Sequence, residues 1–255
     1  MRYLLRELEA VHGMILKSKK IYIMLDFDGT LTPITNDPRL VTLSVDTKAV
    51  LRQLSIDSRF VLVIISGRSM DDVRELVDVE GCVYVGNHGL EMSGPALSFV
   101  HADAAGMSKL LLNISSELTK TVSKKRGLII EDKRLTMSVH YRNVPRQDVP
   151  GIRAAVRKVV RRHKSVEITY GKKVMEVRPR ISWNKGTAAN WLIERFGDGL
   201  PLYFGDDRTD EDAFSALRYG ITVLVSQKWR SSNAKYYVKS TEEVVAFLKS
   251  MISPE

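Results

Sequence analysis

Five short apolar runs, each ending at a polar residue, constrain the fold of this 255-residue chain more than any other feature. Near-continuous apolar runs of this length are typical of parallel strands that are buried on both faces. The runs cover residues 21–26, 59–66, 82–89, 201–207 and 221–226.

Helical patterns alternate with these runs. Ser69 and Asp72 have the spacing of a helix-start box, and Gly197 follows another pattern as a C-terminal glycine would. Strands that alternate with helices predict a doubly wound α/β core, with a Rossmann-like parallel sheet between layers of helices. The helical patterns cover residues 44–54, 69–77, 185–196, 209–217 and 240–251.

Residues 90–180 follow a different pattern, in which each of two helices precedes a pair of strands. We interpret this α-β-β-α-β-β order as an inserted α+β module. The predicted domains are therefore a core, made of residues 1–89 and 181–255, and a module made of residues 90–180. The module's helices are expected at 108–122 and 149–163, and its strands at 128–131, 134–142, 166–170 and 173–179.

Strand alternation predicts two unlike faces for the small sheet of this module. Met137 and Val139 share one face of the second strand, and His140 and Arg142 share the other. Glu176 is expected on the polar face of the last strand. The apolar face would lie under the two helices.

Charge is unevenly spread along the chain. Residues 120–180 hold 18 Lys and Arg against 5 Asp and Glu, a net charge of +13, whereas the rest of the chain carries −4. Such a basic surface can hold nucleic acid or attract a small anionic substrate, and charge alone does not decide between these.

The remaining composition excludes several classes of protein. No apolar run approaches the ~20 residues that span a bilayer. The first residues have the apolar spacing of an amphipathic helix over 2–16 rather than that of a signal peptide. The single cysteine, Cys82, rules out an internal disulfide framework. We expect a cytoplasmic, monomeric protein with no membrane partner.

Carboxylates gather at the ends of the predicted strands. Asp26 and Asp28 end the first run and Asp206 ends the fourth, so all three are expected beyond the carboxyl edge of the sheet. The segment GDDRTDED, which begins at Gly205, adds Asp207 and Asp210. Carboxylates packed this closely repel one another unless a cation lies among them, and an oxygen-only donor set favours Mg²⁺ over Zn²⁺.

Groups that suit an anion lie at the same edge. Lys185 begins a helix, where its ammonium group and the free N–H groups of the first turn favour a negative ligand. Ser66, Gly67 and Arg68 lie at another strand–helix junction and suit a phosphate oxygen. Each element alone is more often a cap, a loop or a surface charge, but together and in this order they indicate a phosphoryl-transfer site with a carboxylate nucleophile.

The motifs DFDGT, SGR, NKG and GDDRTDED resemble the four motifs of the haloacid dehalogenase superfamily of phosphohydrolases. The inserted module resembles the type C2 cap of that superfamily. More narrowly, LDFDGTLTPI, GNHGLE and GDDRTDEDAF are similar to the trehalose-6-phosphate phosphatase family. The resemblance implies a Mg²⁺-dependent phosphomonoesterase whose cap controls access and specificity, with trehalose 6-phosphate as substrate.

The resemblance also implies roles for individual residues. Asp26 would attack phosphorus, and Asp28 would first protonate the leaving sugar oxygen and then take a proton from water. Asp26, the backbone carbonyl of Asp28 and Asp206 would hold Mg²⁺, and Asp207 and Asp210 would ligate it or orient its waters. The remaining positions would bind the phosphoryl group or the sugar, or position the acids: Ser66, Lys185, Thr30, Gly67, Arg68, Asn87, His88, Arg142, Lys172 and Glu176.

Two alternatives stay open. The same chemistry would serve another substrate, such as sucrose 6-phosphate or mannosyl-3-phosphoglycerate. A non-catalytic, basic nucleic-acid-binding protein is the other alternative. The acids argue against it, and so does the absence of a basic strand rich in aromatic residues that would stack bases. Several positions also have a structural interpretation, since His88 could serve only to fix its loop and Lys172 could be a solvated turn residue.

Overall fold

The computed structural model describes residues 1–35, 37–122 and 125–252. The chain forms two compact units, Met1–Phe99 with Trp183–Glu255, and Val100–Ser182. The first unit therefore extends about ten residues beyond the predicted boundary at residue 90, because residues 91–100 continue its sheet.

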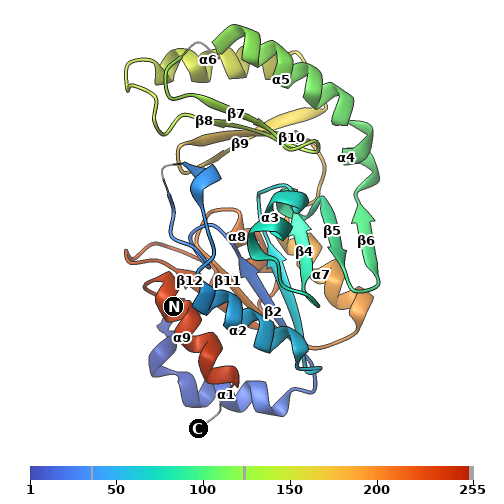
Figure 1. Cartoon of the computed structure of the whole chain (residues 1–255), viewed down its shortest axis with the longest axis vertical. Coiled ribbons are helices and arrows are strands. Elements are labelled where there is room, and N and C mark those ends of the chain that lie inside the picture. The colour runs from blue at the N-terminus through green and yellow to red at the C-terminus, as the bar shows by residue number, and fades with distance from the viewer. Residues whose placement is uncertain (36, 123–124, 253–255) are drawn as a thin grey trace. The chain divides into compact units, whose positions relative to one another are not determined.

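A long sheet forms the centre of the first unit (Figure 1). Within the described residues its strand order is β1-β13-β12-β11-β2-β3-β4-β5-β6. The pairs from β1 to β4 are parallel, and β5 pairs with β4 in the antiparallel direction. The strands are β1 (Arg2–Tyr3), β2 (Ile21–Asp26), β3 (Phe60–Ile65), β4 (Val83–Gly86), β5 (Glu91–Gly94), β6 (Leu97–Val100), β11 (Leu200–Gly205), β12 (Ile221–Val225) and β13 (Tyr236–Val238).

Helices cover both faces of this sheet, as the doubly wound prediction requires. On one face Ile21, Ile23 and Leu25 of β2 join the apolar cluster formed with α1 (Leu8–Lys17), α2 (Val45–Ile56), α3 (Met70–Val77) and α9 (Thr241–Ile252). On the other face, Tyr22 and Met24 join the cluster formed with α7 (Lys185–Phe196) and α8 (Asp210–Ala216). Successive side chains of β2 thus pack alternately against the helices on the two faces of the sheet, which explains its unbroken apolar run.

Local capping sets where the site-bearing helices begin. The Ser69 side chain accepts a hydrogen bond from Asp72 N at the start of α3. At the start of α7, the Asn184 side chain accepts from Thr187 N while Thr187 Oγ1 accepts from Asn184 N. This capping box fixes the first turn of α7, and therefore the position from which Lys185 projects.

The second unit has the predicted α-β-β-α-β-β order, preceded by a short helix, α4 (Ala102–Gly106). Its sheet is antiparallel with the order β7-β8-β10-β9. Met137, Val139, Met175 and Val177 lie in the apolar cluster with α5 and α6, so the predicted apolar face is the one under the helices. The elements are α5 (Ser108–Val122), β7 (Ile129–Asp132), β8 (Met137–His140), α6 (Val149–Val160), β9 (Val166–Gly171) and β10 (Val174–Pro179).

Two predicted elements differ from the structure. The predicted helix over 2–16 begins only at Leu8, because Arg2–Tyr3 pairs with β13 as an edge strand and Leu4–Arg6 forms a 3₁₀ turn. The predicted module boundary at residue 90 is wrong because β5 hydrogen-bonds to β4 and buries Met92 in the core.

Among the residues that the structure describes, none of the helices has both the length and the apolar character needed to span a membrane.

Candidate functional site

Lys185 forms the centre of a buried cluster at the carboxyl edge of the long sheet. It is the first residue of α7 and is 2% exposed. Its Nζ donates to Asp26 Oδ1 at 2.6 Å and to Asp210 Oδ1 at 2.7 Å. A lysine ammonium has three N–H donors, so one remains for another acceptor. The structure thus brings together the predicted nucleophile and the predicted anion-binding lysine, which are far apart in sequence.

Asp210, at the start of α8, accepts hydrogen bonds on both carboxylate oxygens. Besides Lys185, its Oδ1 accepts from Tyr203 Oη at 2.8 Å, and its Oδ2 accepts from the N–H groups of Asp206 and Asp207 at 2.9 Å each. Sequence reasoning missed Tyr203. The available signal was a tyrosine in an otherwise apolar buried strand, since a buried phenol normally has a hydrogen-bond partner.

The carboxylates of Asp26, Asp206 and Asp210 offer oxygen atoms that all lie within 4.8 Å of one another. Burial raises the pKa of Asp26 well above its usual value, and the charges of Asp210 and Asp206 raise it further while Lys185 opposes them. A cation beside these oxygens would relieve that unfavourable charge. The oxygens of Asp26 and Asp206 therefore suit a hard metal ion, whereas both oxygens of Asp210 already accept hydrogen bonds from Lys185, Tyr203 and two backbone N–H groups. Asp207, also predicted as a ligand, does not belong to this group, and its Oδ1 accepts from Arg208 N at 2.7 Å.

The charges of the same cluster change the pKa values of Lys185 and Tyr203. Burial alone would lower the pKa of Lys185, but the charges of Asp210 and Asp26 raise it well above the usual value, so the ammonium is retained. Burial raises the pKa of the Tyr203 phenol, and the charge of Asp210 adds to that effect. Tyr203 is therefore a hydrogen-bond donor to Asp210.

Asp28 is held by Arg68 in a two-bond ion pair. Arg68 Nε donates to Asp28 Oδ2 at 2.7 Å, and its Nη2 donates to Asp28 Oδ1 at 2.8 Å. The same guanidinium also donates to Asp72 Oδ2 and to the carbonyl oxygen of Pro38. Burial would lower the pKa of Arg68, but these ion pairs raise it. Arg68, predicted to bind substrate, therefore lies against Asp28.

Two glycines allow the acidic segments to approach each other. Gly29 has a φ of +93°, and a Cβ there would lie 2.3 Å from Asp206 Oδ2. A Cβ on Gly205 would lie 2.3 Å from Asp210 Cγ. Thr30, predicted to hydrogen-bond and position the acids, is fully buried, and its Oγ1 has no hydrogen-bond partner among the described residues.

Ser66 and the 87–88 turn lie side by side. Ser66 is buried, and its Oγ accepts from Arg68 N at 3.1 Å, while its carbonyl oxygen accepts from His88 N at 2.9 Å. A Cβ on Gly67 would lie 2.5 Å from His88 Cε1, so the absence of a side chain there makes room for the imidazole. Asn87 Nδ2 donates to Glu91 Oε1 at 2.7 Å, which ties this turn to β5.

Comparison with known proteins identifies the family. The family model described as Trehalose-phosphatase matches residues 24–242. The chain belongs to the trehalose-phosphatase family. Members of this family are phosphoric monoester hydrolases, and so is this chain. It is 34% identical to trehalose-phosphate phosphatase B of Arabidopsis thaliana over 92% of this chain and 67% of that protein. It is also 34% identical to trehalose 6-phosphate phosphatase RA3 of Zea mays, over 92% of this chain and 70% of that protein.

Solved structures agree with this assignment. A trehalose-6-phosphate phosphatase related protein superposes with a TM-score of 0.81 at 26% identity, over 91% of this chain and 96% of that chain. The C-terminal domain of the Candida albicans trehalose-6-phosphate phosphatase superposes with a TM-score of 0.80 at 23% identity, over 97% of each chain, which supports the fold.

The second unit of this trehalose-phosphatase chain holds the other predicted positions. Glu176 Oε1 accepts from Lys133 Nζ at 3.0 Å and from Thr136 Oγ1 at 3.4 Å. Arg142 Nη2 donates to the carbonyl oxygen of Lys172 at 2.8 Å, which joins the segment after β8 to the turn between β9 and β10. Sequence reasoning missed Lys133, which lies between the predicted strands at 128–131 and 134–142.

Arg230 is another residue that the motifs did not indicate. Its Nη2 donates to the carbonyl oxygens of Asp206 and Asp207 at 3.2 and 3.3 Å, and its Nη1 lies 3.5 Å from Glu211 Oε1. The loop after β12 thus supports the backbone that carries Asp206. A lone arginine in a polar loop gives no sequence signal for such a contact.

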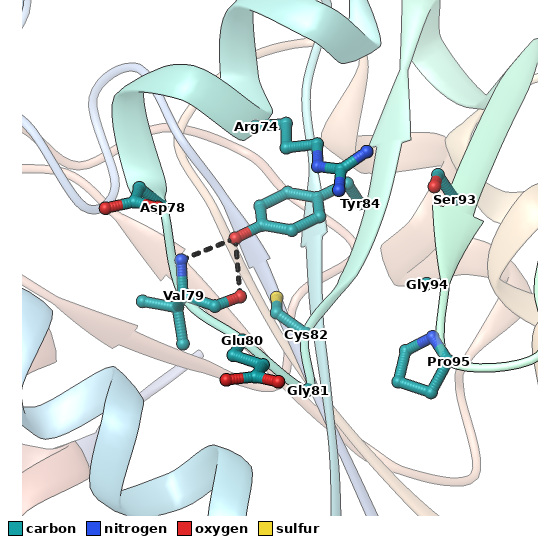
Figure 2. A pocket seen from close by; sticks show the side chains of 10 residues that line it. All are labelled: Arg74, Asp78, Val79, Glu80, Gly81, Cys82, Tyr84, Ser93, Gly94 and Pro95. Atoms are coloured by element: carbon teal, nitrogen blue, oxygen red, sulfur yellow. Dashed lines mark hydrogen bonds between the residues drawn. The ribbon is translucent and has the colours of Figure 1, made fainter.

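A cavity of about 370 Å³ lies in the first unit, at the amino end of β4 and so at the opposite end from Asn87 (Figure 2). Its lining includes Arg74, Cys82, Tyr84 and Ser93. The Tyr84 hydroxyl accepts from the N–H group of Val79 and donates to its carbonyl oxygen, both at 2.8 Å. Burial raises the pKa of the Cys82 thiol, which disfavours a reactive thiolate. None of the predicted site residues lines this cavity.

Proposed function

We propose that this chain is a Mg²⁺-dependent phosphomonoesterase that hydrolyses trehalose 6-phosphate through an aspartyl-phosphate intermediate. One observation carries the proposal: Lys185 Nζ lies 2.6 Å from Asp26 Oδ1, beside the clustered oxygens of Asp206 and Asp210. A nucleophilic carboxylate, a cation-binding oxygen set and an ammonium for the phosphoryl group are the parts that this reaction needs.

In the first half-reaction, a carboxylate oxygen of Asp26 would form a bond to phosphorus as the bond to the sugar oxygen breaks. Asp28 would give a proton to that oxygen, because an alkoxide is a poor leaving group. In the second half-reaction, water would attack phosphorus, the Asp26–phosphorus bond would break, and Asp28 would take the proton from the water. Lys185 and Ser66 would hold phosphoryl oxygens throughout.

The ion pair with Arg68 would position Asp28 for proton transfer. The two hydrogen bonds from the guanidinium would fix the orientation of the Asp28 carboxylate. Mg²⁺, held by Asp26, the carbonyl oxygen of Asp28 and Asp206, would neutralise negative charge on the phosphoryl oxygens.

The polar face of the second unit would supply the sugar contacts and control access as a cap. Lys133 and Glu176 form a hydrogen-bonded ion pair, and such mixed donors and acceptors suit the hydroxyls of a disaccharide. The net charge of +13 over residues 120–180 would attract an anionic phosphate ester. Asn87, His88, Arg142 and Lys172 remain candidates for further contacts. A monomer in the cytoplasm, with no nucleic-acid or membrane partner, also remains a prediction from the sequence.

Phosphate release from trehalose 6-phosphate tests the proposal. We expect turnover with Mg²⁺, none with EDTA, and none for Asp26→Asn, whose fold is checked by circular dichroism. Near-wild-type turnover by Asp26→Asn would refute the covalent mechanism. Assays of sucrose 6-phosphate and mannosyl-3-phosphoglycerate at equal concentration test the substrate, and faster hydrolysis of either would replace trehalose 6-phosphate.

A further inference from the structure

Tyr203 places a hydroxyl group inside the acidic cluster although it lies in the middle of a core strand. It is fully buried on β11, and its ring meets Phe214 of α8 edge to face with ring centres 5.7 Å apart. Its hydroxyl donates to Asp210 Oδ1 at 2.8 Å. The ring belongs to the apolar cluster under α7 and α8, and the hydroxyl contacts the carboxylate that Lys185 also contacts.

The donors around Asp210 fill its acceptor capacity. A carboxylate has about four lone-pair positions, two on each oxygen. Oδ1 accepts from Lys185 and Tyr203, and Oδ2 accepts from the N–H groups of Asp206 and Asp207. With all four positions used, Asp210 is fixed in rotation, and it links the ammonium of Lys185 to the backbone that carries Asp206.

We propose that Tyr203 is a positioning residue of the catalytic centre. By completing the donor set of Asp210, it holds that carboxylate in the one orientation that places Lys185 beside Asp26. This inference rests on the proposed phosphatase site, because it assumes that Lys185 stabilises the phosphoryl group during transfer. Tyr203 itself touches no reacting atom and acts only through Asp210 and Lys185.

Removing the hydroxyl should therefore affect turnover more than substrate binding. Without Tyr203 Oη, Oδ1 of Asp210 keeps a single donor, so the carboxylate can rotate and Lys185 can move with it. Displacements of about 1 Å in a catalytic group cost up to about 100-fold in rate. We expect Tyr203→Phe to lower kcat about tenfold, while KM changes less than about twofold, because positioning matters most in the transition state.

Tyr22 provides a matched control. It lies on β2, the neighbour of β11, is fully buried, and belongs to the same apolar cluster as Tyr203. Its hydroxyl donates to the carbonyl oxygen of Gly197, at the C-terminal end of α7 and away from the acids. Tyr22→Phe removes the hydroxyl of a tyrosine in the same apolar cluster but leaves the contacts of Asp210 intact.

The experiment compares wild type, Tyr203→Phe and Tyr22→Phe by steady-state kinetics and thermal unfolding, with Mg²⁺ present. Each enzyme is assayed on trehalose 6-phosphate and on p-nitrophenyl phosphate. The proposal is supported if the kcat of Tyr203→Phe is about tenfold below that of wild type, on whichever of the two substrates wild type hydrolyses. The Tm of Tyr203→Phe should then be close to that of Tyr22→Phe. A kcat of Tyr203→Phe within twofold of that of Tyr22→Phe overturns the proposal. A loss of activity that is fully explained by the fraction of unfolded Tyr203→Phe protein also overturns it.

The second substrate separates this inference from the proposed function. If wild type hydrolyses p-nitrophenyl phosphate but not trehalose 6-phosphate, the proposed substrate fails. The ratio of kcat values for the two phenylalanine variants still decides the role of Tyr203 in that case. If wild type hydrolyses trehalose 6-phosphate and the two variants behave alike, the role of Tyr203 alone fails.

Discussion

Asp210→Asn should destabilise the protein strongly, although it changes only one oxygen to an NH₂ group. Asp210 is fully buried and both of its oxygens accept from two donors. The asparagine carbonyl can serve one pair of donors, but the NH₂ group then faces the other pair with no lone pair to offer. Two hydrogen bonds to a charged acceptor are lost, at about 1.5–3 kcal/mol each, so we expect a loss of roughly 3–6 kcal/mol.

The measurement is urea and thermal unfolding of the purified variants in EDTA, so that no metal contributes to stability. A loss of this size corresponds to a fall in Tm of roughly 10–20 °C for a protein of this length. Asp207→Asn is the control, because the Asp207 side chain contacts only an exposed N–H group, that of Arg208, in the interactions described above. We expect it to change stability by less than about 1 kcal/mol. If the two variants unfold within about 1 kcal/mol of each other, the four-donor account of Asp210 is wrong.

Three further changes test other contacts. Arg68→Lys should lower kcat about tenfold, because an ammonium cannot hold Asp28 through two parallel bonds. Arg74→Lys on helix α3, which begins shortly after Arg68, should leave kcat unchanged, and equal rates for the two variants would contradict this. Burial raises the pKa of Tyr84 to about 12, so the free energy of unfolding should fall as pH rises from about 10, where the unfolded phenol ionises, to about 12. Urea unfolding of Tyr84→Phe over this range should show a shallower fall, and an identical slope would exclude the effect. Glu176→Gln should raise KM for trehalose 6-phosphate about tenfold and leave p-nitrophenyl phosphate hydrolysis unchanged, whereas parallel changes would place Glu176 outside sugar recognition.

Most of the parallel core was predictable because its signals are local. The run from Ile21 to Asp26 is apolar at every position except the last, and β2 covers the same residues. The helix predicted over 185–196 coincides with α7, since the cap at Asn184 and the glycine at 197 mark its ends. The gathering of Asp26, Lys185 and Asp206 also followed from a general rule. The carboxyl ends of parallel strands, and the starts of the helices, lie at the same edge of the sheet.

The extra strands at the edges of the sheet gave weaker signals. The segments around Glu91–Gly94 and Leu97–Val100 mix apolar, small and polar residues, which suits several structures equally well. Arg2–Tyr3 is too short for any periodicity to be visible. Each of these segments becomes a strand because a neighbouring strand offers unpaired backbone N–H and C=O groups. That neighbouring strand is either distant in the sequence or joined to the segment by a turn.

The order of residues along the chain was enough to specify the strands, the helix starts and the set of acids, because periodicity and capping act within a few neighbouring residues. The pairing of those groups was settled only when distant segments packed together. Asp28 lies against Arg68, Glu176 against Lys133, and Asp210 among four donors. Such pairings depend on the relative placement of strands and helices, and a buried polar group accepts whichever partner that packing brings within hydrogen-bond distance.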